Sequence, residues 1–347
     1  MKFFHISFVI SICLLLTLSV SAIDNSFRLD FDGDGRTDIA VYREGSRSFD
    51  VAPQSSYWYF LNTQTGIISV VPWGRTLDVP APADYDNDSK TDTAVFRWWD
   101  FETGDTNEWR IGKSSGGHQV TTFEIGFGYH KYSRNYTGDG RAELGQLYVV
   151  DISQKPDENC FIINYFISSL DGGNIIKQVS DNCNVGLTPV PGDYNNDGYS
   201  EIAVFTNRTF KVWYAPYGSG YTTPDIVQFW DVDMPTPGDY DGDGKTDFAG
   251  IKREANRLHW HIKQSSSGAE VDMEFGFLTD KPVPGNYDSD SKTDIAVFRP
   301  SDSSWWILNS FDGVVSSWYF GLPTDTPLAM PVIPFDPRIY NLTDNNE

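Results

Sequence analysis

The chain has 347 residues and carries 48 Asp and Glu against 26 Lys and Arg, so its formal net charge is −22 at pH 7. A chain this acidic shows no basic stripe that could displace counterions from phosphate, which argues against nucleic acid as a partner. No stretch beyond residue 22 sustains helical periodicity, and this favours an all-β protein.

Residues 1–22 are typical of a signal peptide. Lys2 precedes an apolar run over residues 3–18, and Val20-Ser21-Ala22 fits a signal-peptidase site. A membrane anchor is the alternative, but the run is short for a spanning helix and no later stretch is apolar enough to span. We therefore expect a secreted protein that begins at Ile23 and does not insert into a membrane.

The mature chain then introduces a nine-residue pattern whose clearest copy is Asp239–Asp247, with the sequence D-Y-D-G-D-G-K-T-D. Carboxylates occupy positions 1, 3, 5 and 9, while Gly242 and Gly244 permit a tight curl. Oxygen ligands suit Ca²⁺, whereas Zn²⁺ prefers Cys or His. An Asx-rich turn without metal is the alternative. The recurrence of closely packed like charges, which repel by kcal/mol amounts, favours calcium.

Six copies of this loop occur along the chain. The third has Asn135 and Thr137 at its first two ligand positions, keeps two carboxylates and is expected to bind weakly. In the others, an Asn that replaces an Asp still offers a neutral oxygen. The predicted metal ligands are Asp30, Asp32, Asp34 and Asp38; Asp84, Asp86, Asp88 and Asp92; Asp139 and Glu143; Asp193, Asn195, Asp197 and Glu201; Asp239, Asp241, Asp243 and Asp247; and Asn286, Asp288, Asp290 and Asp294.

The segments between loops repeat one order of four strands. An apolar strand follows each loop, then a Trp-bearing strand, then one that ends in an aromatic residue before a small or polar residue, then a Pro-punctuated strand that leads into the next loop. The first kind is expected at 39–42, 93–96, 202–205, 248–251 and 295–298, and the second at Trp58, Trp109, Trp213, Trp260 and Trp305. Four short strands per unit, with loops about 50 residues apart, predict a β-propeller.

The two ends of the chain indicate how the ring closes. The first loop has only a short leader before it, residues 25–29, whereas residues 327–332 form a Pro-punctuated strand with no loop after it. A C-terminal strand that completes the first blade would remove an exposed sheet edge. We predict one domain, residues 23–335, of six four-stranded blades, or seven if the longest interval holds a divergent one. Residues 336–347 are expected to be a frayed tail.

The D-x-D-G-D-G-x-x-D loops followed by I-A-V-F strands resemble FG-GAP/VCBS repeats, the units of integrin α-subunit propellers and of many secreted microbial proteins. The resemblance covers nearly all of the mature chain. It implies a propeller whose loops hold Ca²⁺ between the first two strands of a blade, with roles in extracellular recognition or adhesion. It implies little about the ligand, because one fold hosts unrelated functions.

Several residues fall outside the repeat. The recurring tryptophans are expected in the core, whereas off-pattern aromatic residues could form a surface platform for a ligand. This possible platform consists of Trp98, Trp99, Tyr129 and Tyr132, with His130 and Tyr136 close to the last two in sequence. His259 and His261 share one face of a predicted strand and could bind a transition metal, but no third ligand is evident, so a solvated or hydrogen-bonded pair is favoured.

No catalytic residue is predicted. The chain has no nucleophile elbow, zinc-protease helix or nucleotide-binding loop, and carboxylates held by metal would not serve as general acids. In an oxidising compartment Cys160 and Cys183 should form a disulfide.

We therefore expect a secreted, calcium-stabilised propeller that acts as an extracellular binding or adhesion module for a glycan or a protein. A polysaccharide-cleaving lyase or hydrolase on the same scaffold is one alternative. A structural spacer of a cell-surface assembly is another.

Overall fold

The structure is a computed structural model, and it describes residues 28–46, 55–97, 108–122, 130–151, 161–168, 174–181, 188–214, 223–288 and 290–329. The predicted signal peptide, the disulfide between Cys160 and Cys183 and the C-terminal tail lie outside these residues.

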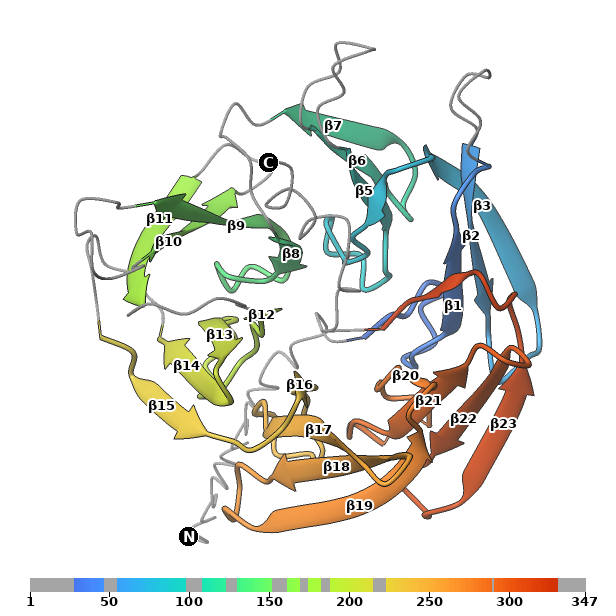
Figure 1. Cartoon of the computed structure of the whole chain (residues 1–347). Coiled ribbons are helices and arrows are strands. Elements are labelled where there is room, and N and C mark those ends of the chain that lie inside the picture. The colour runs from blue at the N-terminus through green and yellow to red at the C-terminus, as the bar shows by residue number, and fades with distance from the viewer. Residues whose placement is uncertain are drawn as a thin grey trace, which may run out of the picture.

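Six four-stranded antiparallel sheets surround a central axis (Figure 1). From the axis outward, the first blade is β24 (Thr326–Pro327), β1 (Ile39–Arg43), β2 (Ser55–Leu61) and β3 (Ile68–Arg75). The second is β4 (Val79–Pro80), β5 (Thr93–Arg97), β6 (Glu108–Gly112) and β7 (His118–Thr122), and the third is β8 (His130–Arg134), β9 (Glu143–Asp151), β10 (Phe161–Ser168) and β11 (Asn174–Asp181).

The fourth blade is β12 (Thr188–Pro189), β13 (Ile202–Thr206), β14 (Thr209–Trp213) and β15 (Ile226–Phe229), and the fifth is β16 (Met234–Pro235), β17 (Phe248–Glu254), β18 (Arg257–Lys263) and β19 (Glu270–Phe277). The sixth is β20 (Lys281–Pro282), β21 (Ile295–Arg299), β22 (Ser304–Leu308) and β23 (Val315–Tyr319). The predicted six-bladed β-propeller is confirmed, and the longest interval holds no seventh blade among the sheets of the described chain.

Strand position in the blade explains the sequence pattern. β1, β5 and β21 carry four consecutive buried residues because neighbouring blades cover both of their faces. The outer strands β7 and β23 alternate between exposed and half-buried residues. Five innermost strands are two residues long and end in proline. Proline has no N–H to donate, which suits an edge strand beside the axis.

The ring closes between the two ends of the described chain. β24 pairs with β1, with Val41 opposite Pro327, and the Leu328 N–H donates to the Ala40 carbonyl at 2.9 Å. Arg43 on β1 also forms a bidentate ion pair with Asp325, with both N–O distances at 2.8 Å. Closure of the first blade by the C-terminal strand is therefore confirmed.

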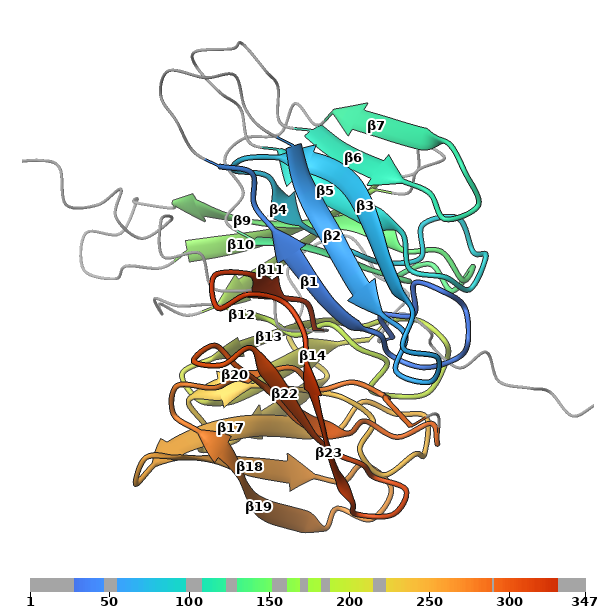
Figure 2. The same ribbon diagram turned by 90° about the vertical axis from the view of Figure 1, so that its right-hand side faces the viewer.

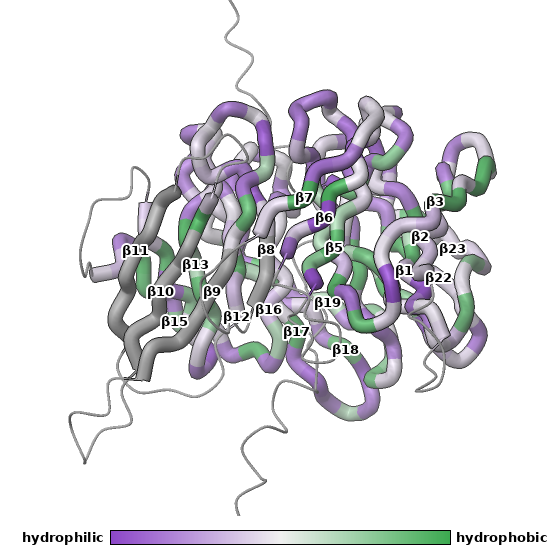
Figure 3. Tube along the Cα trace, turned by 90° about the horizontal axis from the view of Figure 1, so that it is seen from above, coloured by the Kyte–Doolittle hydropathy of each residue, from purple (hydrophilic) through white to green (hydrophobic). Residues whose placement is uncertain are grey.

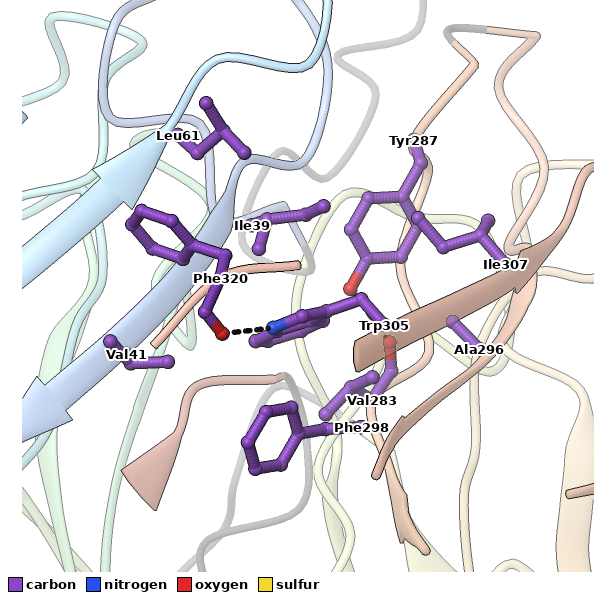
Figure 4. Packing of buried hydrophobic residues seen from close by; sticks show 10 residues of the cluster. All are labelled: Ile39, Val41, Leu61, Val283, Tyr287, Ala296, Phe298, Trp305, Ile307 and Phe320. Atoms are coloured by element: carbon purple, nitrogen blue, oxygen red, sulfur yellow. Dashed lines mark hydrogen bonds between the residues drawn. The ribbon is translucent and has the colours of Figure 1, made fainter. Parts of the chain in front are cut away.

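The recurring tryptophans are buried between blades, as expected. Trp305 packs with Phe298 and Phe320 in a cluster that joins the sixth blade to Ile39 and Val41 of the first (Figure 4). The indole N–H of Trp305 donates to the Phe320 carbonyl at 3.1 Å. Trp58 and Trp260 make the same bond to the carbonyl 15 residues later.

Trp213 differs from the other recurring tryptophans in one respect. Trp213 is buried, but the strand register places it opposite Ile202 at the start of β13. The residue that pairs with the aromatic Phe205, as Trp109 pairs with Phe96, is Phe210. The rings of Phe205 and Phe210 pack in a tilted arrangement with their centroids 4.9 Å apart. The hydrophobic position recurs, and the tryptophan does not mark it in this blade.

A second recurring contact joins a buried Asp to an Arg at the end of β1, β5 and β21 away from the loops. Arg97 binds Asp78 and Arg299 binds Asp280 in the same bidentate manner as Arg43 binds Asp325. Each Asp follows an aromatic-Gly pair by four residues. In Phe275-Gly276 the glycine has φ +99°, where a side chain would meet Val297. The aromatic-Gly signature therefore marks the turn that brings this Asp to the Arg.

The described residues contain no helix long and apolar enough to cross a membrane. Figure 3 shows the ring from its edge, with hydrophobic and hydrophilic residues intermixed along the described chain.

We predict that Trp305→Ala destabilises the folded protein by about 3–5 kcal/mol, because it removes a fully buried indole and leaves a cavity between two blades. Thermal or urea unfolding followed by circular dichroism measures the loss. Tyr319→Ala is the matched control, since Tyr319 is 75% exposed. Equal effects of the two substitutions would contradict the assigned core.

Candidate metal centres

The six acidic loops lie at one end of the ring. Each loop ends where the second strand of a blade begins, as Asp38 precedes β1 and Asp247 precedes β17. Figure 2 shows the first blade from the side, where β1 and β2 run in opposite directions through the thickness of the disc. Since all the second strands run in the same sense relative to their loops, the loops gather at one end and the Arg–Asp pairs at the other.

All six loops share one hydrogen-bonding pattern. The carboxylate at position 9 accepts the N–H of position 2 at 2.6–2.9 Å in every loop, as Asp38 does from Phe31. The carboxylate at position 5 accepts the N–H of position 7 at 2.8–2.9 Å in every loop. Backbone N–H groups thus hold the acidic side chains against the loop.

Position 1 is the centre of the curl. In the fifth loop, Asp239 accepts the N–H groups of Gly242 at 2.6 Å and Gly244 at 2.9 Å. Both glycines have positive φ, +81° and +85°. In the second loop Asn87 and Ser89 take these two positions with φ +61° and +68°, which explains why Gly and Asn predominate there.

Four loops bring three carboxylates close together. One ligand oxygen of each lies within 4.8 Å of the others in these groups: Asp30, Asp32 and Asp38; Asp84, Asp86 and Asp92; Asp193, Asp197 and Glu201; and Asp239, Asp241 and Asp243. The donor set is oxygen alone, which fits a hard cation such as Ca²⁺.

The second loop contains a further observation that fits a cation. Asp86 Oδ1 is buried and accepts no hydrogen bond from any described residue. An unpaired buried carboxylate oxygen is costly, and a cation bound with Asp84 and Asp92 would remove that cost. The residues present therefore fit the ion that the repeat pattern implies.

Burial dominates the electrostatics of the loops. Removal from water raises the pKa of Asp38 and Asp247 to about 7 and that of Asp92 and Asp294 to about 6, and nearby loop carboxylates add to the effect. The pKa of Asp239 at position 1 also rises to about 6 for the same reason. These loops favour either a proton or a cation, because the bare charges repel one another out of water.

The third and sixth loops differ from this pattern. In the third, the Thr137 hydroxyl donates to Glu143 at 2.9 Å, and Asn135 Oδ1 takes the place of the position 1 carboxylate by accepting the Gly138 N–H. Burial raises the Glu143 pKa to about 7. In the sixth, position 1 is Asn286. Its backbone N–H donates to the Thr37 hydroxyl oxygen at 3.0 Å. The loop geometry persists with fewer charges.

Neighbouring loops are joined by a closed ring of backbone hydrogen bonds. The N–H of position 8 donates to the carbonyl of position 1 in the preceding loop at 2.6–2.7 Å. The six donors and acceptors are Thr37 to Asn286, Thr91 to Asp30, Ala142 to Asp84, Ser200 to Asn135, Thr246 to Asp193 and Thr293 to Asp239. The loops therefore link each blade to the next.

Two sets of residues at this end were not predicted from the sequence. Tyr85, Tyr194, Tyr240 and Tyr287 occupy position 2, and their hydroxyls donate to the carbonyl four residues earlier. The recurring Tyr at position 2 was the signal that could have revealed this anchor. Turns between the third and fourth strands also touch the carboxylates, through Asn62, Ser114, Ser115, Ser265, Ser266 and Ser310.

The other predicted candidates stand apart from the loops. Trp98, Trp99 and Tyr129 lie outside the described residues, and Tyr132 lies in β8 with its side chain outside the description. His261 is hydrogen-bonded through Nδ1 to Asp272 on β19, directly across the strand pair, and Glu274 lies across from His259. The favoured interpretation as a hydrogen-bonded pair therefore agrees with the structure for His261.

No protein-family model and no curated protein matches the chain. Solved structures do resemble it. One is a protein from Lactobacillus plantarum, with 10% identity, a TM-score of 0.41 and coverage of 85% of this chain and 95% of that chain. Another is a putative 6-phosphogluconolactonase from Bacteroides fragilis, with 12% identity, a TM-score of 0.37 and coverage of 86% and 97%. Similarity at this level carries no inference about activity.

With a chelator present, we predict that the protein loses stability as the pH rises from about 4 to about 7. The folded state holds protons on Asp38, Asp247 and their counterparts that the unfolded chain has already released, so the stability contributed by these protons is lost across that range. Melting temperatures at pH 5 and pH 8 in chelator measure the effect. A protein more stable at pH 8 than at pH 5 under these conditions would contradict it.

Proposed function

We propose that the protein is a secreted, calcium-stabilised β-propeller that binds an extracellular glycan or protein. The observation that carries the calcium part is the convergence of three carboxylates in four loops, together with the unpaired buried oxygen of Asp86. The acidic side chains at positions 1, 3, 5 and 9 would hold the ions. Bound Ca²⁺ supplies positive charge that offsets their mutual repulsion.

The proposed ions have a structural role in this function. Each loop is hydrogen-bonded to its neighbours, so an ion that holds one loop in its curl also preserves the bonds to the two adjacent blades. Metal binding to the folded state alone adds directly to the free energy of unfolding. An extracellular protein would find this ion in its surroundings, which agrees with the predicted signal peptide.

The proposed recognition surface lies at the end opposite the loops. β5 begins beside the second loop and ends at Arg97, where it leads into the segment that contains Trp98 and Trp99. The segment that ends at Tyr129 leads into β8 from the same end, because β8 runs toward the third loop. β5 thus ends, and β8 begins, at the face that the metal loops leave free, which favours that face as a separate ligand surface.

We predict that EDTA lowers the melting temperature sharply at neutral pH. At a calcium concentration ten times the dissociation constant, each site contributes about 1.4 kcal/mol, so four sites contribute about 5–6 kcal/mol, a large part of the roughly 5–15 kcal/mol typical of a folded domain. Differential scanning calorimetry measures the shift. EDTA already saturated with calcium is the control, and an unchanged melting temperature in free EDTA would refute the metal assignment.

We also predict calcium-dependent binding of a glycan or a protein that is reduced at least tenfold by the double substitution of Trp98→Ala and Trp99→Ala. Loss of stacking area explains the reduction. A glycan array and an array of extracellular proteins, each probed with and without calcium, provide the measurement. Tyr319→Ala, an exposed aromatic at the rim, is the control. Binding to neither array would contradict the recognition role, and release of reducing ends or unsaturated products from a polysaccharide would replace it with an enzymatic one.

A further inference from the structure

The turns between the third and fourth strands of four blades reach back over the acidic loops. These capping turns are residues 62–66, 113–117, 264–268 and 309–313. They come from the outer half of each blade, whereas the acidic loop joins its inner strands. Contacts between them therefore connect two hairpins of one sheet.

The fifth blade shows the contacts most completely. The Ser265 N–H donates to Asp247 Oδ1 at 2.7 Å, and the Ser265 hydroxyl lies 2.8 Å from both carboxylate oxygens of Asp243. The Ser266 hydroxyl donates to Asp241 Oδ2 at 2.6 Å. One turn thus holds positions 3, 5 and 9 of the loop at the same time.

Two other blades repeat this arrangement. In the second, the Ser114 N–H donates to Asp92 at 2.6 Å and its hydroxyl to Asp88 at 2.7 Å. In the sixth, the Ser310 N–H donates to Asp294 at 2.6 Å, and its hydroxyl lies 3.0 Å from both oxygens of Asp290. The same atoms of the turn meet the same loop positions in three blades, so the contact is a property of the repeat.

The first blade reaches the same carboxylates with a different group. Asn62 Nδ2 donates to Asp32 at 2.5 Å and to Asp34 at 2.7 Å. Its Oδ1 accepts the N–H of Thr65 at 2.6 Å and the Thr65 hydroxyl at 2.7 Å. Because the carbonyl oxygen is held on the far side, the amide presents only its N–H groups to the loop. Asn62 therefore donates to the carboxylates and does not compete with them as a ligand.

Asp86 indicates what these donors achieve. The Ser115 hydroxyl donates to Asp86 Oδ2, while Asp86 Oδ1 is buried without a hydrogen-bond partner among the described residues. Asp86 also belongs to the carboxylate group with Asp84 and Asp92. One oxygen is thus fixed from outside, and the other is left for a cation. Metal-ligating carboxylates are commonly hydrogen-bonded in this way by a second layer of residues, whose loss costs about 10–100-fold in affinity.

We propose that the hydroxyl and amide groups of the capping turns are positioning residues for the calcium sites, with Ser114, Ser115, Ser265, Ser266, Ser310 and Asn62 in this role. The inference rests on the proposed function, since it requires that the loops bind a cation. Each site is then built from two hairpins, and the bound ion ties the outer strands of a blade to its inner ones.

The test compares calcium affinity loop by loop. Hydrogen exchange read by mass spectrometry over a calcium titration gives a separate midpoint for the peptide that contains Asp239–Asp247 and for the peptides of the other loops. In the double substitution of Ser265→Ala and Ser266→Ala, we expect the midpoint of the fifth loop to rise at least tenfold. The midpoint of the first loop should stay unchanged.

The control is Ser267→Ala, in the same turn. The Ser267 hydroxyl donates to Gln264, not to a carboxylate, so this substitution should leave every midpoint unchanged. Ser265→Thr keeps a hydroxyl, so the fifth loop of this variant should retain the calcium affinity that Ser265→Ala loses. Melting in EDTA measures the stability that the lost hydroxyl contacts cost without calcium. The double variant should lose more melting temperature, relative to the unmodified protein, in calcium than in EDTA.

The outcomes distinguish this inference from the function on which it rests. If the midpoint of the fifth loop rises in Asp243→Asn but not in the double serine variant, the loops bind calcium and the capping turns do not position the ligands. If no loop of the unmodified protein responds to calcium, the proposed function itself fails. Ser310→Ala repeats the test in the sixth blade and should raise the midpoint there, and an unmoved midpoint would count against the inference in the same way.

Discussion

The structure depends on one backbone hydrogen bond that occurs at every junction between blades. The N–H of position 8 in a loop donates to the carbonyl of position 1 in the preceding loop, and after six such bonds the circle returns to its start. The bond between Thr37 and Asn286 joins the first loop to the last one, far away in sequence. Together with the pairing of β24 with β1, it makes the ring closed at two separate places. A loop that lost its curl would break contacts with both of its neighbours.

This constraint explains why the loops must fold tightly. Tight folding in turn brings their carboxylates close together, so that the charges repel one another. Position 1 has to place its carbonyl for the neighbouring blade while its side chain accepts N–H groups of its own loop, as Asp239 does from Gly242 and Gly244. The remaining carboxylates then crowd into a small space, and burial raises the pKa of those at position 9, such as Asp38 and Asp247. A bound cation is the natural counter-charge for such a group, and the hydroxyls of the capping turns hold the carboxylates from the outside.

The end of the propeller that carries the acidic loops differs from the opposite end in the contacts that hold it together. The Arg–Asp pairs at the opposite end, such as Arg97 with Asp78, join a half-buried Arg to a buried Asp in a bidentate manner and need no ion. Variation is tolerated where the backbone pattern survives, since the third loop keeps its hydrogen bonds with two carboxylates and a Thr. Loops away from the metal end take no part in this hydrogen-bond pattern and are therefore free to diverge.

Much of the fold could be predicted from the sequence because each repeat is determined by residues that are close together in the chain. Regularly spaced acidic loops with Gly, Asn or Ser at the positive-φ positions, and the Pro-punctuated strand left over at the C-terminus, were sufficient to predict six blades and their closure. The predicted ligand positions also converged in four loops. These features depend on residues within nine positions of one another or on a strict period, and so they can be predicted from the sequence alone.

Other features appeared only in three dimensions, because they depend on register and on contacts between hairpins. Trp213 seemed to continue the series of core tryptophans, but pairing placed Phe210 at that position. The serines of the capping turns lie 16 to 22 residues after the carboxylates that they touch through their N–H groups, a spacing that changes with hairpin length. The sequence by itself determined which loops and strands form, since turn chemistry and hydrophobic period are local. The tertiary structure decided which loops meet and which hydroxyls reach them, because those contacts arise only when the sheets are closed into a ring.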